Sequence, residues 1–403
     1  MSLRALMLSG LVFLVAAPDG AARESPAAAG DGIGSDLPYP PVGQPEADRI
    51  VHVPTGLELS FEGMMDMMAG ARLVCIGESH DNYRAHEVQL QVVRELHRRF
   101  PGRVAIGMEM FRWPQQEILD RWTGGELDEL EFLEAVDWHR TWSTDYRHYA
   151  AILGFARDQG LDVIALNPSR ELQDAVRQFP PDALPQEFRD ELPEVGDSDP
   201  YQHAVLEAFY GGHLPTPGAF ESFFRVQLLW EESMAERIVA YLGSARGRGR
   251  IMVTLTGSGH VEYGFGIPKK VIRRMPMPYV ILAPTEIEVP PEKQMPDVRL
   301  PELPLYPADF IWWIPYEDLE ARKIRLGVGV AERDGILVVS QVEAGSPAER
   351  AGMLPGDEIA AVAGQPVSSA TTLVHWVVTQ SPGASAIVTV RRAGAPLELS
   401  VEF

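Results

Sequence analysis

The stretch that decides the fold class is residues 73–80, which read LVCIGESH. Four consecutive apolar residues are too few for a helix and do not alternate with polar ones, a pattern typical of a short strand buried on both faces. The polar residues Glu78, Ser79 and His80 follow at once, and open α/β sheets place their ligands at the carboxyl ends of strands. The stretch therefore predicts a buried strand with functional side chains at its end.

Further apolar runs of the same kind occur along the chain and are separated by segments with helical periodicity. Between the first two runs, for example, apolar residues recur at helical spacing over Ala85–Phe100. Buried strands alternating with helices predict an α/β domain with a largely parallel sheet and flanking helices. The four further runs are Val104–Met108, Val163–Leu166, Ile251–Leu255 and Tyr279–Leu282.

Residues 180–245 interrupt this alternation. Tyr201–Tyr210 and Phe220–Tyr241 read as helices inserted before the fourth strand, and we expect them to form a helical lid over a sheet end. The next irregular stretch, Pro284–Pro307, contains seven prolines in 24 residues, too many for a helix or a central strand. It predicts a strap or linker over residues 285–322.

Composition limits the classes of function. The chain has 35 basic and 57 acidic residues and a formal net charge of −22, which repels nucleic-acid phosphates and anionic membrane surfaces. We therefore expect no nucleic-acid partner. The single cysteine, Cys75, excludes an internal disulfide and CxxC motifs, so any metal or haem site must use His, Tyr, Met or carboxylate ligands.

The N-terminus has the order of zones found in export signals. Arg4 precedes an apolar run over Ala5–Ala17, and the small residues Gly20–Ala22 follow. The run is too short to span a bilayer of about 30 Å, and no later stretch is long enough. These features predict a signal peptide over residues 1–22, a flexible leader over 23–49, no transmembrane span, and a periplasmic or secreted protein.

From residue 323 the pattern changes to short alternating strands with glycine-containing turns, which predicts a small β-rich domain over residues 323–403. The motif GSPAERAG at Gly345–Gly352, followed by GDEI at Gly356–Ile359, resembles the PDZ domains of bacterial periplasmic proteases. That resemblance implies that the C-terminus of a partner protein adds as an extra strand. The carboxylate would lie on the loop Leu326, Gly327, Val328 and Gly329.

Four charged or titratable residues follow the proposed buried strands: Glu78, His80, Glu109 and His260. Parallel neighbouring strands would bring them together at one sheet edge, with Asn167 beside them. Two carboxylates and two imidazoles can bind a divalent metal ion such as zinc, or act as catalytic acid and base without metal. The alternative is a buried structural ion-pair network.

Two common motifs are absent from these residues. Their spacing does not match the HExxH pattern of zinc proteases, and the turn at Gly257–His260 fails the GxGxxG pattern because Glu262 occupies the third glycine position.

A separate feature is the aromatic segment 113–149, which is rich in tryptophan and tyrosine. It could line a pocket for a planar ligand or form the core of amphipathic helices.

Several of these motifs together resemble the ChaN-like haem-binding uptake family of the Tiki superfamily, over roughly residues 70–285. The motifs are GESHDN with His86, GMEMF, DWHRTWSTDY, ALN, VQLLWEESMA and GSGHVEYGFGIP. The resemblance implies an α/β core over residues 50–284, a role in haem or iron uptake, and haem beneath a helical lid. Related metal-dependent peptidases and esterases use Glu and His at positions matching Glu78, His80, Glu109 and His260.

Three functions remain open at this point. The first is an exported haem-binding protein, for which His80, Tyr83, His86, Met108 and Tyr201 are candidate axial ligands. The second is a metal-dependent hydrolase that uses the Glu and His set to activate water. The third is an interaction protein whose α/β domain is catalytically idle and whose PDZ domain binds partner C-termini.

Overall fold

The computed structural model describes residues 45–196, 199–210, 218–293, 305–319, 324–333 and 335–403. The predicted signal peptide and most of the predicted leader lie outside these residues. By its internal contacts the chain divides into two compact units. The first unit comprises residues 1–124 and 143–317, and the second comprises residues 125–142 and 318–403.

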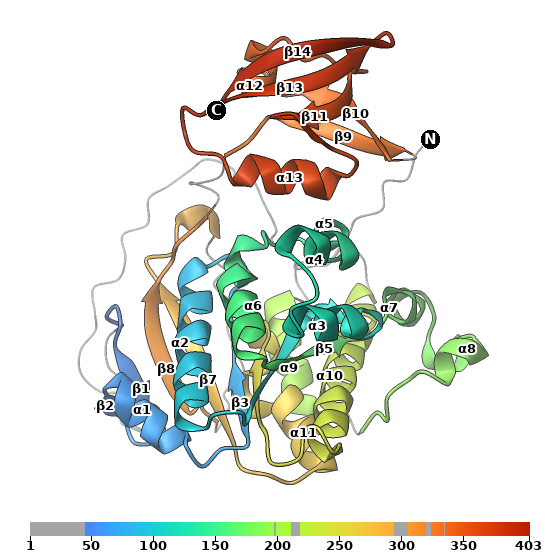
Figure 1. Ribbon diagram of the computed structural model, residues 1–403. Coiled ribbons are helices and arrows are strands. Elements are labelled where there is room, and N and C mark those ends of the chain that lie inside the picture. Colours follow the sequence, from blue (N-terminus) through green and yellow to red (C-terminus); the bar gives the residue numbers. More distant parts are fainter. Residues whose placement is uncertain (1–44, 197–198, 211–217, 294–304, 320–323, 334) are drawn as a thin grey trace, which may run out of the picture. The chain divides into compact units, whose positions relative to one another are not determined.

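The first unit is built on one eight-stranded sheet with the order β2-β1-β8-β7-β3-β6-β4-β5 (Figure 1). Every pair from β8 to β5 is parallel, whereas β1 pairs antiparallel with both β2 and β8. The predicted largely parallel sheet is confirmed. Its strands are β1 (Ile50–His52), β2 (Leu57–Leu59), β3 (Leu73–Ile76), β4 (Val104–Arg112), β5 (Asp162–Asn167), β6 (Ile251–Leu255), β7 (Tyr279–Ile287) and β8 (Phe310–Pro315).

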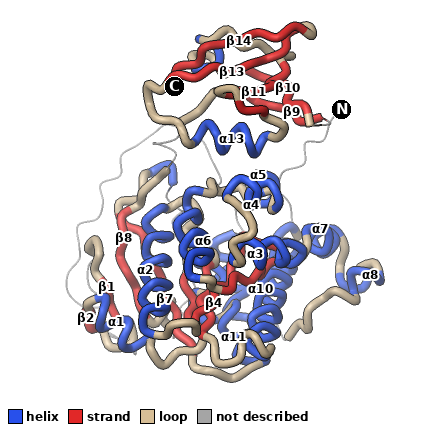
Figure 2. The backbone as a smooth tube through the Cα atoms, viewed as in Figure 1, coloured by secondary structure: helices blue, strands red, loops and turns tan. Residues whose placement is uncertain are grey.

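Helices flank this sheet, as the tube view in Figure 2 shows. The predicted helix over Ala85–Phe100 is α2 (Tyr83–Arg99), which begins where the Asn82 side chain accepts a hydrogen bond from the N–H of Arg84. The other helices of the first unit are α1 (Phe61–Met68), α3 (Gln116–Thr123), α6 (Arg147–Gln159), α7 (Arg170–Gln178), α8 (Gln186–Arg189), α9 (Pro200–Tyr210), α10 (Ala219–Gly243) and α11 (Ile267–Arg274).

Side chains form hydrogen bonds with the free backbone edge of the edge strand β5. Gln116 uses its amide like a strand backbone, donating to the carbonyl of Val163 at 2.9 Å and accepting from the N–H of Ala165 at 2.9 Å. Trp113 donates from its indole to the carbonyl of Leu166 at 3.0 Å. An unpaired strand edge invites pairing with other chains, so these contacts protect it.

Three strands of the first unit were not predicted from the sequence, namely β1, β2 and β8. β8 lies within residues 285–322, predicted as a strap or linker, yet it pairs in parallel with β7 and antiparallel with β1. Its sequence, FIWWIP, is apolar, and Ile314 is completely buried. The prolines before it are typical of an irregular segment, but within β8 only the last residue, Pro315, lacks a backbone donor.

The two helices of the predicted lid have different roles. α10 packs against β5, α7 and α11, and its residues Met234, Ala235 and Ile238 are fully buried in the core. It is therefore part of the layer that covers the sheet. α9 is shorter and exposes Tyr201, so of these two helices only α9 resembles the predicted lid.

The aromatic segment serves mainly as core. Trp122 and Trp138 are each 1% exposed, and Tyr149 is completely buried. Large aromatic side chains bury extensive apolar area, which stabilises the packing of short helices. The core interpretation therefore holds for these three residues.

The second unit contains an antiparallel sheet with the order β14-β13-β11-β10-β9, and β12 pairs with β11. Its core is apolar, and the buried Asp357 carboxylate binds the Arg392 guanidinium through two contacts of 2.8 Å. The predicted β-rich domain is confirmed. The elements are α4 (Glu129–Ala135), α5 (Trp138–Thr141), β9 (Val328–Arg333), β10 (Ile336–Val342), α12 (Pro347–Arg350), β11 (Glu358–Val362), β12 (Gln365–Pro366), α13 (Ala370–Val378), β13 (Ser385–Arg392) and β14 (Ala395–Glu402).

Within the described residues, none of the helices combines the length and the apolar character that crossing a membrane requires.

Candidate functional site

The four strand-end residues predicted to converge lie at one edge of the parallel sheet. β3, β6 and β4 are neighbours, and Leu255 in β6 pairs with Ile76 in β3 and with Met108 in β4. Because the three strands are parallel and in register, the residues that follow these positions share the carboxyl edge. Glu78 and His80 come from the segment after β3, Glu109 from β4, and His260 from the turn after β6.

Two glycines allow the turns after β3 and β6 to approach closely. A Cβ atom on Gly77 would lie 2.7 Å from the Ser258 hydroxyl, and one on Gly257 would lie 3.3 Å from His80 Nε2. The N–H of Ser258 also donates to the carbonyl of Glu78 at 3.0 Å. The glycines of both motifs are therefore needed to bring the functional side chains together.

Glu78 is the centre of the first half of the site. Its carboxylate is buried and accepts hydrogen bonds from Tyr149 at 2.8 Å and Gln89 at 2.6 Å, with His80 Nδ1 at 2.7 Å from the same carboxylate oxygen as Tyr149. His86 Nδ1 lies 3.5 Å from the other oxygen. The carboxylate is thus held on both oxygens, and His80 is oriented by one of its ring nitrogens.

Burial by itself would raise the pKa of the Glu78 carboxyl, but the charge of His86 and the hydrogen bonds from His80 and Gln89 outweigh it and hold the pKa at about 2. Burial would lower the pKa of His80, but the hydrogen bond to Glu78 and the charge of Glu109 raise it above its ordinary value. The His80 side chain is 25% exposed, whereas Glu78 is fully buried. His80 is therefore the accessible titratable group of this pair.

The second half of the site is a chain of alternating charges. Glu109 accepts from the N–H of Gly257 at 2.7 Å, and its other oxygen lies 3.5 Å from His260 Nε2. On the opposite side of the imidazole, Nδ1 lies 2.9 Å from the Gln227 amide and 3.5 Å from Glu231, which in turn binds Lys270 at 2.7 Å. His260 thus lies between two buried carboxylates.

The charges of these groups depend on one another. Burial would lower the pKa of His260, but Glu109 and Glu231 raise it to about 10, so the imidazole is a cation at neutral pH. Burial would raise the pKa of Glu231, but Lys270 and His260 hold it at about 2. Burial would also raise the pKa of Glu109, but His260 lowers it below its usual range.

Four residues of this network were not identified from the sequence: Gln202, Gln227, Glu231 and Lys270. Gln227 and Glu231 are four residues apart on α10, and the Gln227 amide donates to Glu231 at 2.8 Å. Gln202 on α9 donates to the same carboxylate at 2.7 Å. The sequence contains one indication of this network: Gln227 and Glu231 are polar residues at helical spacing inside the otherwise apolar stretch VQLLWEES.

The residue before Gln202 on α9, Tyr201, belongs to an aromatic surface, defined here as Tyr201, Phe265 and Tyr263. The rings of Tyr201 and Phe265 are stacked at 6.5 Å and 8°, and those of Tyr263 and Phe265 at 5.9 Å and 23°. Tyr201 is 53% exposed. Because Gln202 is bound to Glu231, the same network that surrounds His260 also positions this exposed ring.

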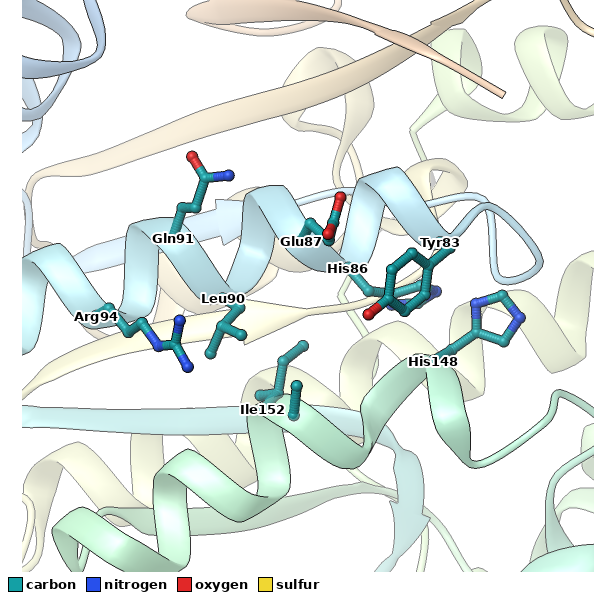
Figure 3. A pocket seen from close by; sticks show the side chains of 9 residues that line it. Tyr83, His86, Glu87, Leu90, Gln91, Arg94, His148 and Ile152 are labelled. Atoms are coloured by element: carbon teal, nitrogen blue, oxygen red, sulfur yellow. The ribbon is translucent and has the colours of Figure 1, made fainter. Parts of the chain in front are cut away.

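Tyr83 and His86 lie elsewhere, in a cavity of about 130 Å³ between α2 and α6 (Figure 3). His148 also lines this cavity, and its ring lies 5.0 Å from that of His86. Burial, followed by the nearby His86, lowers the pKa of His148 to about 4, so this imidazole is neutral. His86 has a hydrogen-bonding neighbour at each ring nitrogen, namely Gln89 and the carbonyl of His80.

The remaining predicted residues are less accessible. Met108 is completely buried within the sheet, and Asn167 donates to the carbonyl of Glu109 at 2.5 Å while its side-chain oxygen has no partner among the described residues. Within the described part of the chain, no group of three or more His, Cys, Asp or Glu side chains is arranged to hold a metal ion.

In the second unit, the predicted peptide loop precedes the edge strand β9. Gly327 has φ +78°, and a Cβ atom there would lie 2.2 Å from that of Ser346, so the position requires glycine. The backbone N–H groups of Leu326 and Gly327 have no acceptor among the described residues, while their carbonyls accept from Ala348 and Glu343. Unpaired donors next to an edge strand are what a peptide carboxylate needs.

Fold and site together define a protein with two units: an α/β domain with buried charges at the carboxyl edge of its sheet, and a small antiparallel domain with an edge strand. A family model described as haem-binding uptake, Tiki superfamily, ChaN matches residues 64–271, more than half of the chain, and a PDZ model matches residues 325–403. The chain belongs to this ChaN-like haem-binding uptake family and carries a C-terminal PDZ domain.

Comparison with known proteins agrees with this division. A solved structure titled cofacial heme binding to ChaN of Campylobacter jejuni is 16% identical, with a TM-score of 0.50, and covers 65% of this chain and 95% of that one. At that identity it shows the common fold alone. A probable periplasmic DegP-like serine endoprotease of Rhizobium meliloti is 37% identical over 82 residues, and a putative zinc metalloprotease of Ralstonia nicotianae is 36% identical over 76 residues. The chain spans only 16% of the length of each of these two relatives.

The position of His260 between two carboxylates predicts the effect of Glu231→Gln. The variant removes one carboxylate, so the pKa of His260 should fall from about 10, and Lys270 loses its buried partner, which should cost about 3–5 kcal/mol of stability. NMR titration of the imidazole and urea unfolding measure the two effects. Glu236→Gln is the matched control, because Glu236 is exposed on the same helix.

The pH dependence of stability has a definite sign. A histidine whose folded pKa is raised stabilises the fold fully below its unfolded value of about 6.5 and loses that contribution as pH rises through the folded value. The free energy of unfolding should therefore decline between about pH 7 and pH 10, and decline less in Glu231→Gln. An unchanged His260 titration in this variant would contradict the proposed pairing.

Proposed function

We propose that the α/β domain binds haem at the exposed aromatic surface formed by Tyr201, Phe265 and Tyr263. The observation that carries this proposal is the stacking of these rings, two of them accessible, beside α9, which Gln202 joins to Glu231. Flat aromatic area is what a porphyrin requires, and a tyrosine phenolate is an established type of axial ligand. Membership of the haem-binding uptake family supports the same ligand.

Geometry favours this surface over the cavity of Tyr83 and His86. That cavity has about 130 Å³, below the roughly 300–1,000 Å³ of pockets that enclose a ligand of drug size. His86 is also occupied by hydrogen bonds at both nitrogens, and Met108 is fully buried. Tyr201 is therefore the candidate axial ligand that a large planar group reaches without rearrangement of the core.

The residues around the proposed haem surface have separate tasks. Haem, when bound, would supply an iron centre whose ligand is the Tyr201 oxygen. Gln202 fixes the start of α9 through Glu231, and Asp199 caps this helix and pairs with Lys269. We further propose export to the periplasm and a role in haem uptake, supported by the N-terminal sequence pattern and the family description.

The haem proposal predicts that Tyr201→Phe alters haem binding. Removing the phenolic oxygen removes the axial ligand, so the Soret band should shift and the affinity for haemin should fall at least tenfold, about 1.4 kcal/mol. Haemin titration followed by absorbance measures both. Tyr241→Phe is the control, because its phenolic oxygen binds Asp162 at the start of β5 and does not belong to the aromatic surface.

The alternative ligand is tested in the same series. If Tyr201→Phe binds haemin with an unchanged spectrum while Tyr83→Phe or His80→Ala changes it, the ligand lies at the segment after β3 and the aromatic surface is not the haem site. If none of the variants differs from the parent, haem does not bind at this edge of the sheet.

A second candidate function is hydrolysis, favoured by the Glu78 and His80 pair. Glu78 holds one ring nitrogen of His80 at 2.7 Å, and the other nitrogen lies near Gly257, at the carboxyl edge of the sheet. An imidazole oriented by a buried carboxylate can accept a proton from water, whose oxygen then attacks an ester or amide carbonyl. The proton would pass to the leaving group, and Glu78 would remain ionised.

This candidate predicts esterase activity that depends on His80. With p-nitrophenyl acetate, His80→Ala should lower the rate by about 10²–10⁴. The rate should rise with pH and have its midpoint above 6.5, because the neutral imidazole is the base and its pKa is raised. His139→Ala, at an exposed histidine, controls for incidental imidazole catalysis.

Chelation separates the metal-dependent form of this function from the metal-free one. A rate abolished by a chelator and restored by zinc would support the metal-dependent hydrolase expected from the superfamily. A rate equal in the parent and in His80→Ala would exclude hydrolysis at this site.

We also propose that the PDZ domain binds the C-terminus of a partner protein by adding it beside β9. The support is the position of β9 at the sheet edge together with the unpaired N–H groups of Leu326 and Gly327. Val328 and Gly329 would continue the pairing along the peptide. Charge capture by the loop and strand addition would together provide the affinity.

This proposal predicts that amidating a peptide's C-terminus weakens binding, because the loop donors lose a charged acceptor. Gly327→Ala should abolish binding, since an added Cβ would collide with Ser346 and the φ of +78° is strained for alanine. Gly335→Ala is the matched control, with φ +73° but open space around it. Fluorescence anisotropy with free and amidated peptides measures the effect, and equal affinities would refute this binding mode.

A further inference from the structure

A second cavity lies beside the middle of β5, further along α10 than Glu231. It has a volume of about 260 Å³ and is lined by α3, β5 and α10. Both helices pack on β5, so the walls belong to the rigid part of the first unit. Its position beside the middle and start of β5 separates it from Glu109 and His260, which lie at the carboxyl edge.

Most polar groups around this cavity already have partners. Arg246 binds Asp120 at 3.1 Å and Asp162 at 2.6 Å, and the Tyr241 hydroxyl donates to Asp162 at 2.5 Å. The amide of Gln116 is committed to the backbone of β5. The hydrogen-bonding groups of this wall are therefore satisfied by one another.

Arg237 is the exception. Its guanidinium carbon lies 5.9 Å from the centre of the Trp113 ring, but it forms no hydrogen bond or ion pair with the described residues, and its Nε is buried without a partner. Burial lowers its pKa below the usual value, although the charges of Glu236 and Asp120 act in the opposite direction. A half-buried cation that no carboxylate contacts is costly, and a bound anion would reduce that cost.

The lining indicates which anion fits. The Arg237 fork can bind a carboxylate through two parallel hydrogen bonds. The Asp120 carboxylate also lines the cavity and would repel a dianion such as phosphate, while Ile164 and Ala240 offer apolar surface. One unpaired cation beside apolar side chains suits a single negative charge on an apolar body.

We propose that this cavity binds a small organic monocarboxylic acid, with its carboxylate on Arg237 and its apolar part against Ile164 and Ala240. The site is independent of haem binding, of hydrolysis and of the PDZ domain. It gives the first unit a second ligand site, beside the middle of β5 and away from the carboxyl end of that strand.

Benzoate is the probe for this site, and benzamide is its neutral counterpart of the same shape. Isothermal titration of the full chain should show binding of benzoate and at least tenfold weaker binding of benzamide. Arg237→Gln should weaken benzoate at least tenfold, whereas Arg140→Gln, which removes the same charge at a side chain that is 84% exposed, should leave it unchanged.

Further measurements keep the proposal falsifiable if Arg237→Gln is poorly folded. Arg237→Lys keeps the charge but loses the two-fold hydrogen bond, so it should bind benzoate with intermediate affinity, and benzoate should slow hydrogen exchange around residues 237–241 of the parent. Equal binding of benzoate and benzamide, or unchanged affinity in both variants, would overturn the site. Binding of inorganic phosphate as strong as that of benzoate would overturn the assignment to an organic acid.

Discussion

A protonated histidine buried between two carboxylates is the constraint on which the site depends. His260 can hold its charge away from water only while Glu109 and Glu231 flank it, and Glu231 in turn requires Lys270. These four residues come from β4, the turn after β6, α10 and α11. The network therefore joins strands and helices that are far apart in the sequence, and each member fixes the charge of the next.

The position of α9 follows from the same network. Gln202 binds Glu231, so the helix that presents Tyr201 is attached to the buried charges rather than to apolar packing alone. The Glu78 half of the site is organised differently, since its carboxylate is held by neutral donors and histidines. The His260 half of the site thus positions the aromatic surface through α9. The Glu78 half contains one accessible imidazole, that of His80.

The two units have different structural features for recognising ligands. The α/β domain offers aromatic area and buried charge at a sheet edge, features suited to a planar ligand or to proton transfer. The PDZ domain offers backbone donors at a glycine loop beside an edge strand. Arg237 adds a third kind of feature, a half-buried cation that no carboxylate contacts among the described residues.

The sequence by itself determined the class of each unit and the composition of one site. Continuous apolar runs such as Leu73–Ile76 can only be strands buried on both faces, so the parallel sheet and the meeting of Glu78, His80, Glu109 and His260 at its edge were predictable. The motif around Gly345 likewise identified the PDZ domain. Periodicity and short motifs are local properties, and they survive in any fold that the chain adopts.

Only the tertiary structure decided which groups are paired, exposed or charged. Nothing in the sequence distinguishes Glu231 and Lys270 from other residues of amphipathic helices, because their pairing depends on the packing of α10 against α11. The exposure of Tyr201, the burial of Met108 and the unpaired charge of Arg237 depend in the same way on neighbours far along the chain. β8 was missed for this reason too: its place in the sheet is fixed by β7 and β1, whereas the prolines before it are a local signal.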